Sequence, residues 1–93
     1  MKLVSVTRAD DKHKFVATFE INGHLKHVKF GDRNYQDFTQ HKDETRRQAY
    51  LLRHKSTEDW NVPTTAGALS RWILWEKPTL KEAITFFRRK FNV

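Results

Sequence analysis

Residues 15–30 read FVATFEINGHLKHVKF, two alternating apolar and polar runs that flank Asn22-Gly23. Asn-Gly is the strongest short-range signal for a two-residue type I′ hairpin, because both of its residues tolerate positive φ. With this loop, the facing pairs are Ile21 with His24, Phe19 with Lys26, Ala17 with Val28, and Phe15 with Phe30. The apolar pairs fall on one face, as a half-buried antiparallel sheet requires.

A further strand precedes this hairpin. Val4 and Val6 alternate with polar neighbours, and the polar stretch 9–12 separates them from the second strand. A turn at Asp10-Asp11 opposes Val6 to Phe15 and Val4 to Ala17, again on the apolar face. The sequence therefore predicts a three-stranded meander over residues 1–30.

The remainder, residues 31–93, is helical in pattern. A loop at residues 31–34 is followed by a predicted helix from about Phe38 to His54, with Asp37 as its N-cap candidate. The side of this helix expected to face the core carries Phe38, Thr45, Ala49 and Leu52.

Two more helices are expected after a connector at residues 56–63. Thr64 or Thr65 caps a short helix that runs to Trp75, whose broad apolar arc indicates contacts on several sides. Thr79 and Glu82 form a capping box for the last helix. Its apolar stripe consists of Leu80, Ala83, Ile84, Phe87 and Phe91. The predicted fold is a single α+β domain over residues 1–93, with three helices packed on one face of the sheet.

Composition limits the functions this chain can have. It has 93 residues and no cysteine, which excludes disulfides and cysteine nucleophiles. The 18 Lys and Arg against 11 Asp and Glu give a net charge of +7, which favours a polyanionic partner, either nucleic acid or an acidic protein. The longest apolar run, Trp72 to Trp75, is far too short to cross a membrane. No signal peptide is expected at the N-terminus, so secretion is not expected either.

From Phe30 onward the chain carries a longer pattern of characteristic residues. It comprises Phe30-Gly31, Tyr35, Asp37-Phe38-Thr39, His41-Lys42-Asp43, Arg46-Arg47, Tyr50, Arg53-His54, Trp60, Pro63, Thr65-Ala66-Gly67, Leu69-Ser70-Arg71-Trp72, Leu74-Trp75 and Lys77-Pro78-Thr79-Leu80. This pattern, over about two-thirds of the chain, resembles a family of small basic uncharacterised proteins of large double-stranded DNA viruses of algae and amoebae. The resemblance implies a viral origin and a place in the virion or the host cell interior, cytoplasm or nucleus. It assigns no catalytic residue.

Basic residues gather on the side of the first helix opposite its apolar arc. Arg46, Tyr50, Arg53 and His54 follow one another at steps of four, three and one. Arginine donors suit phosphate oxygens and tyrosine can stack, so this side is a candidate nucleic-acid surface. The full candidate set is Arg46, Arg47, Tyr50, Arg53, His54, Lys55, Arg88, Arg89 and Lys90. The alternative is a solvated face, with Asp43 paired to Arg47 and the last three cations serving the helix dipole.

A second candidate site is a shallow polar pocket beside the sheet, bordered by Tyr35, Asp37, His41 and Lys42. The alternative is structural: Lys42 extends along its apolar stem to water, and His41 bonds a loop carbonyl. Asp37 and His41 have helical spacing but no third ligand, so neither a metal nor another cofactor is expected.

Large aromatic residues outside the predicted core stripe raise the question of an interface. Phe86 lies away from the stripe that contains Phe87, and Trp60 and Trp75 are further candidates. Trp72 is expected in the core.

These observations support one leading function and two alternatives. The leading hypothesis is a non-enzymatic, basic viral protein that associates with nucleic acid mainly through phosphate contacts. The first alternative is a structural or adaptor protein of the virion or infected cell that binds a protein partner, with a homodimer through a sheet edge or Phe86 as one form. The weaker alternative is a small enzyme that uses His41 with Asp37.

Overall fold

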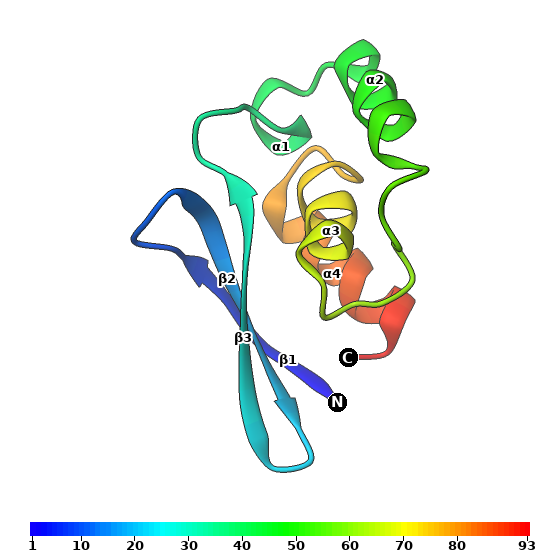
Figure 1. Cartoon of the computed structure of the whole chain (residues 1–93). Helices are drawn as coiled ribbons and strands as arrows, with labels where there is room; N and C mark the ends of the chain where they lie inside the picture. The colour runs from blue at the N-terminus through cyan, green and yellow to red at the C-terminus, as the bar shows by residue number, and fades with distance from the viewer.

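The computed structural model describes residues 1–93 and has an α+β fold (Figure 1). Three antiparallel strands come first, in the order β1 (Lys2–Arg8), β2 (His13–Ile21) and β3 (His24–Asp32). The helical part comprises α1 (Phe38–His41), α2 (Glu44–His54), α3 (Ala66–Leu69), the π-helical segment η1 (Ser70–Leu74) and α4 (Leu80–Phe91). The predicted class, a three-stranded meander followed by helices, is confirmed.

The hairpin between β2 and β3 has the predicted register. Ile21 pairs with His24, and the pairing continues in step to Phe15 with Phe30. Asn22 has a φ of 53° and Gly23 a φ of 80°, so both loop residues adopt the left-handed region that a type I′ turn requires.

The predicted pairing of β1 is wrong. The sequence placed Val6 opposite Phe15 and Val4 opposite Ala17. The observed pairs are Leu3 with Phe19, Val6 with Ala17, and Arg8 with Phe15. The turn occupies the four residues 9–12 rather than two, and the register shifts between Leu3 and Ser5. As a result Leu3 is fully buried, whereas Val4 is 46% exposed.

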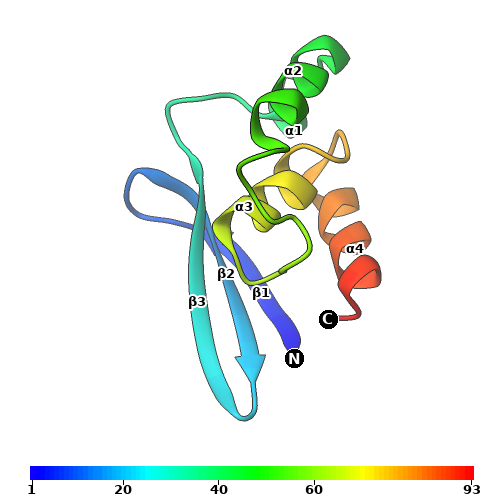
Figure 2. The same ribbon diagram turned by 45° about the vertical axis from the view of Figure 1, so that its right-hand side comes forward.

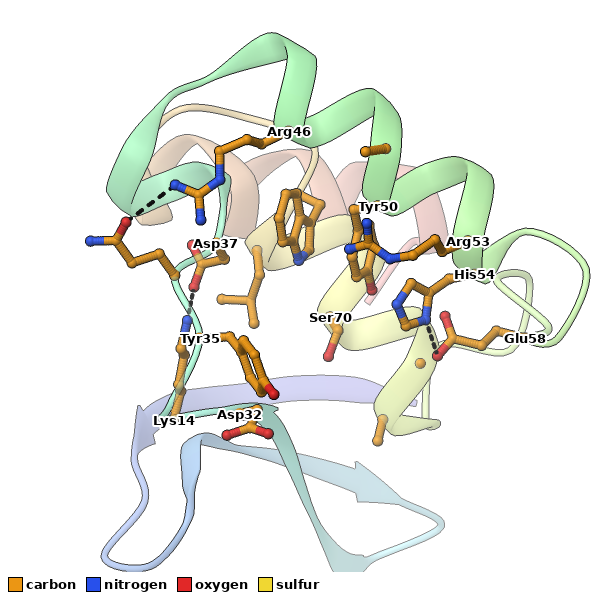
Figure 3. Close-up of a pocket in the computed structure, with 17 residues that line it drawn as sticks. Lys14, Asp32, Tyr35, Asp37, Arg46, Tyr50, Arg53, His54, Glu58 and Ser70 are labelled. Carbon is orange, nitrogen blue, oxygen red and sulfur yellow. Dashed lines mark hydrogen bonds and ion pairs between the residues drawn. The ribbon is translucent and has the colours of Figure 1, made fainter.

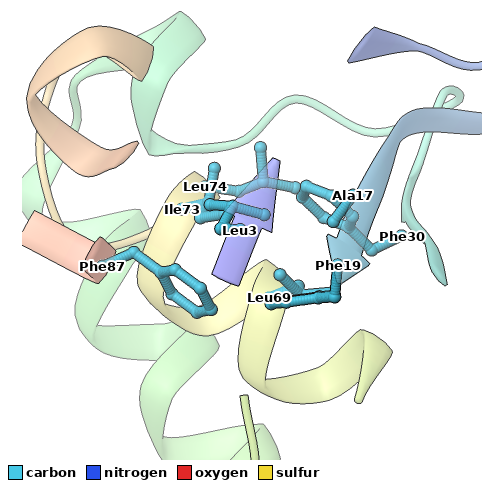
Figure 4. Close-up of a cluster of buried hydrophobic side chains, with 8 residues drawn as sticks. All are labelled: Leu3, Ala17, Phe19, Phe30, Leu69, Ile73, Leu74 and Phe87. Carbon is cyan, nitrogen blue, oxygen red and sulfur yellow. The ribbon is translucent and has the colours of Figure 1, made fainter. Parts of the chain in front are cut away.

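The core lies between one face of the sheet and the segments α3, η1 and α4 (Figure 4). Its eight buried residues are Leu3, Ala17, Phe19, Phe30, Leu69, Ile73, Leu74 and Phe87. Thr65 caps α3 and Thr79 caps α4, each accepting a hydrogen bond from a backbone N–H three residues on. Phe87 is in the core as predicted, while Phe86 is only half-buried.

The predicted helix from Phe38 to His54 is two helices. Lys42 adopts a left-handed conformation (φ 56°, ψ 28°) and ends α1. Asp43 then caps α2 by accepting hydrogen bonds from the N–H groups of Thr45 and Arg46. Asp37 is the predicted cap of α1, in a capping box completed by Gln40.

The break changes which side of α2 faces inward. The inner side carries Arg47, Tyr50, Leu51 and His54 at helical spacing. Leu52, predicted to face the core, is 77% exposed, and Thr45 is exposed as well. In Figures 1 and 2, α2 lies above α3 and beyond the end of the sheet.

Candidate functional site

A groove of about 810 Å³ separates α2 from the segment that follows β3 (Figure 3). Its first wall comprises Lys14, Gly31, Asp32, Tyr35, Gln36 and Asp37. Its second wall comprises Arg46, Ala49, Tyr50, Arg53, His54 and Glu58. Ala66, Gly67, Ser70, Leu74 and Trp75 of α3, η1 and the residue after it complete the lining. A volume of this size is in the range of small-molecule and cofactor pockets.

Four aromatic rings form a column along the inner side of α2. Trp75 lies between His41 (ring centroids 5.3 Å apart) and Tyr50 (4.1 Å, interplanar angle 3°). His54 stacks on the other face of Tyr50 at 4.3 Å. Burial raises the pKa of the Tyr50 hydroxyl, so this group stays protonated at all physiological pH values. Tyr50 is therefore buried in the second wall and is not on the outer basic face that the sequence predicted.

A buried ion pair fixes the first wall. The Lys14 Nζ donates to the Asp37 carboxylate at 2.6 Å and to the Gln40 side-chain oxygen at 2.8 Å. Asp37 also caps α1 through Thr39. The side chains of Lys14 and Asp37 are only 10% and 3% exposed, so both charges are committed to each other.

Arg47 is not available for a nucleic-acid contact, contrary to the prediction. Its guanidinium donates to the Trp75 carbonyl at 2.7 Å, to Glu44 at 3.0 Å and to Glu76 at 3.0 Å. Glu76 also accepts a hydrogen bond from the buried Arg71 at 2.9 Å. This network ties α2 to the end of η1 and positions Trp75 beside Tyr50.

Arg46 and Arg53 are the exposed cations of the groove. In Figure 3 both side chains extend from α2 over the groove, and Tyr35 lies on the opposite wall. The only intramolecular hydrogen-bond partner of the Arg46 guanidinium is the Gln36 side-chain oxygen at 3.4 Å, which is a weak contact. The Arg53 side chain makes no hydrogen bond or ion pair within the protein. These two of the predicted nucleic-acid residues therefore share one site with the buried Tyr50 and the half-buried His54.

The predicted polar pocket is half right. Tyr35 and Asp37 line the groove, whereas His41 and Lys42 lie outside it. His41 Nδ1 accepts a hydrogen bond from the Asp43 backbone N–H at 2.9 Å, and burial lowers the pKa of the ring. The Lys42 Nζ donates to the Thr39 carbonyl at 2.8 Å. The His41 backbone N–H donates to the Asp37 carbonyl at 3.0 Å, but the two side chains form no hydrogen bond with each other, so the dyad of the enzyme hypothesis is not made.

The remaining basic candidates lie away from the groove. Lys55 is the exposed C-cap of α2. In α4, Arg88 donates to the Leu3 carbonyl at 2.8 Å, and the Lys90 ammonium lies 4.2 Å from the centre of the Trp72 ring. Arg89 is exposed. In Figure 1 and Figure 2, α4 runs below α2, and none of the three basic residues of α4 lines the groove.

The aromatic interface candidates are mostly in internal contacts. Trp60 donates from Nε1 to Glu58 and covers Arg71, and its carbonyl accepts from the Trp72 indole. Trp75 belongs to the aromatic column of the groove. Phe86 packs beside Trp72, with ring centroids 5.9 Å apart. Trp72 is half-buried against the core rather than fully inside it.

Nothing in the sequence indicated Asp32, Gln36, Glu58 or Ser70 as site residues. Each enters the groove through the tertiary arrangement rather than through a motif. One residue of the sequence could have indicated this arrangement. Asp43 is suited to cap a new helix that begins at Glu44, as well as to place a charge in the first turn of a longer helix. With a second helix starting there, the prediction would have placed Tyr50 on the inner side.

Fold and groove together define a small basic α+β protein with an aromatic-lined groove and two exposed arginines at its rim. The chain belongs to a family of unknown function, DUF5754, whose model matches residues 4–54, from β1 to the end of α2. No curated protein and no solved structure matches the chain. The matched residues include most of both groove walls.

Two structural features concern other classes of function. Nowhere do three or more His, Asp or Glu side chains gather in a way that could hold a metal ion. None of the helices combines the length and the apolar character needed to cross a bilayer.

Proposed function

We propose that the protein binds nucleic acid without catalysing a reaction, through phosphate contacts made by Arg46 and Arg53 at the rim of the groove. The observation that carries this proposal is the pair of exposed guanidinium groups, neither held by a carboxylate, in a chain of net charge +7. Arginine presents several donors in a fixed geometry that matches phosphate oxygens.

No acid of the groove forms an ion pair with either of these two cations. Three acids and three cations line it, namely Asp32, Asp37 and Glu58 against Lys14, Arg46 and Arg53. Each acid is already engaged within the molecule. Asp37 pairs with Lys14, Glu58 accepts from the Trp60 indole and lies 3.4 Å from His54, and Asp32 accepts from the Asn34 N–H. With Lys14 and Asp37 paired, two cations and two acids remain, and the positive charge of the groove is concentrated on α2 at Arg46 and Arg53.

Fluorescence anisotropy with labelled mixed-sequence DNA and RNA across a salt series tests the proposal. Arg46→Gln with Arg53→Gln removes two charges from the rim. Lys26→Gln with Arg89→Gln is the matched control, because it removes two exposed charges, one in β3 and one in α4, neither of which lines the groove. Only the first pair should flatten the slope of log K against log salt at physiological salt, by about 0.9 per contact on duplex DNA and about 0.7 on a single strand.

The loss should be the same for unrelated sequences, because phosphates carry no base identity. The proposal fails if the wild type shows no salt-sensitive binding. It also fails if the two double variants weaken binding equally, since net charge alone would then explain the attraction.

A second candidate is the structural or adaptor protein that binds an acidic protein or a second copy of itself. The observation in its favour is that Val4 of β1 and Leu25 of β3 are exposed, and that Leu25 lies on the same face of the sheet as His27 and Lys29. Light scattering that gives twice the chain mass of 11.1 kDa, reduced to the monomer by Leu25→Lys, would support this candidate.

The viral origin and the location in the virion or the host cell interior are part of the same proposal, and they rest on the sequence resemblance. Mass spectrometry of purified virions and of infected-cell fractions tests them. Its presence in neither fraction would remove this part of the proposal.

A further inference from the structure

We infer that the groove takes a single strand of nucleic acid, with an unpaired base between Tyr35 and α2, in preference to a duplex. This inference rests on the proposed function and adds the form of nucleic acid that the site recognises. It follows from how charge, aromatic rings and free polar groups are distributed over the two walls.

Charge is segregated across the groove. The exposed cations, Arg46 and Arg53, both come from α2, whereas Asp32 stands on the opposite wall. Seven residues of helix separate the two arginines, a rise of about 10 Å. That distance lets the two guanidinium groups contact different phosphates of one strand. A strand would therefore run with its phosphates along α2 and its bases toward Tyr35.

Tyr35 is placed to receive a base. Its side chain is exposed (71%), and it makes no ring contact, hydrogen bond or ion pair within the protein. In Figure 3 it stands across the groove from Tyr50 and His54. Aromatic side chains beside cations that follow the backbone are the usual means of holding single strands, because every base has a π-face. The ring has no other packing role in this fold.

The floor leaves room for a base and can bond its edge. Ala66 and Gly67 are small, and the Ser70 hydroxyl lines the groove without an intramolecular partner. Gln36 offers an amide that is bonded only weakly, to Arg46. In a duplex the bases are paired and stacked, so none can enter this groove without the cost of being flipped out. A duplex is therefore limited to phosphate contacts at the rim.

The test compares three labelled probes at one physiological salt concentration: a mixed-sequence single strand, the corresponding duplex, and a single strand in which abasic sites replace several bases but all phosphates remain. The wild type should bind the intact strand at least about fivefold more tightly than either of the others. Tyr35→Ala should lose at least about fivefold on the intact strand only, and Tyr35→Phe should retain its affinity because the stacking surface remains.

The outcomes separate this inference from the proposed function. Equal affinity for all three probes, still sensitive to Arg46→Gln with Arg53→Gln, overturns the single-strand inference and leaves the phosphate site standing. An unchanged affinity of Tyr35→Ala for the intact strand overturns it as well. Absence of binding to every probe overturns the proposed function itself. Thermal melts of the Tyr35 variants should match the wild type, because the side chain is exposed and makes no contact.

Discussion

Gly23 and Gly31 both have a φ of +80°, but they differ in how closely other atoms surround them. Substituting each with alanine therefore separates the effect of backbone strain from that of steric crowding. At Gly23 an added Cβ meets nothing within 4 Å, so Gly23→Ala should cost only the strain of a left-handed backbone, about 1–2 kcal/mol. At Gly31 the Cβ would lie 3.0 Å from a Leu74 methyl and 3.1 Å from the Lys14 Cβ. Gly31→Ala should therefore lower the free energy of unfolding by more than Gly23→Ala. Urea denaturation measures both, and equal losses would contradict the close packing of β3 on η1.

His41 should make folding sensitive to mild acid. Burial, with a smaller contribution from Arg46, lowers the pKa of its ring in the folded protein, while the unfolded chain keeps the ordinary value near 6.5. The unfolded state then binds the proton more readily. The stability contributed by neutral His41 is therefore complete above about pH 6.5 and is lost as the pH falls from there toward the folded pKa.

The measurement is the melting temperature at neutral pH and near pH 5.5 for wild type and His41→Phe. Phenylalanine keeps a ring beside Trp75 but removes the titrating group. The wild type should lose more stability on acidification than the variant does. Parallel losses would assign the acid sensitivity to the four other histidines of the chain.

Neighbouring residues show what the sequence could and could not predict about the site. Arg46 and Arg47 were both predicted as phosphate ligands, yet Arg46 extends over the groove and Arg47 is held by Glu44 and Glu76. One step along a helix rotates a side chain by about 100°. The roles of these residues therefore depend on the helical phase, and the break at Lys42 changes that phase.

Elements that depend on contacts between residues close in sequence were predictable, whereas elements that depend on distant contacts were not. The β2–β3 hairpin was predictable because its two-residue loop sets the register. The register of β1 was not, because it depends on a longer turn and on an irregularity at Val4 that leaves no mark in the sequence. The caps at Asp37, Thr65 and Thr79 were predictable, since each is satisfied by its own helix.

The network that joins α2 to η1 can be tested through its shared acid. Glu76 is 17% exposed and pairs with both Arg47 and Arg71, whereas Glu44 is 62% exposed and pairs with Arg47 alone. Glu76→Ala leaves two arginines poorly compensated and should cost about 3 kcal/mol. Glu44→Ala should cost much less than Glu76→Ala, because its ion pair is in solvent. Chemical denaturation compares the two, and similar losses would mean that Arg47 and Arg71 reach water without Glu76.

The groove itself could not be predicted, because its parts meet only in the folded chain. Lys14 of β2 and Asp37 are 23 residues apart, and Trp75 stacks on Tyr50 from 25 residues further along. The sequence supplied the residue types, the net charge and two of the four pocket residues. Contacts between residues so far apart leave no periodic pattern in the sequence, so they are known only from the packing of the folded chain.

Because the molecule is longer than the Debye length at physiological salt, the salt concentration determines whether charges remote from the groove affect binding. The chain extends over 41 × 26 × 25 Å, and the Debye length is about 30 Å at 0.01 M salt but about 8 Å at 0.15 M. At the lower salt every surface cation attracts a polyanion bound in the groove. Lys26→Gln with Arg89→Gln should then weaken binding measurably, although these residues lie far from the rim.

At about 0.15 M salt the remote double variant should bind as tightly as the wild type, because screening removes attraction beyond one Debye length. The rim pair, Arg46→Gln with Arg53→Gln, should weaken binding at both salt concentrations, since its guanidinium groups contact phosphates directly. Affinities of the wild type and the two double variants at the two salt concentrations form the complete measurement. If the remote double variant still weakened binding at the higher salt, we would place the phosphate contacts nearer to α4. The groove would then no longer be the principal site.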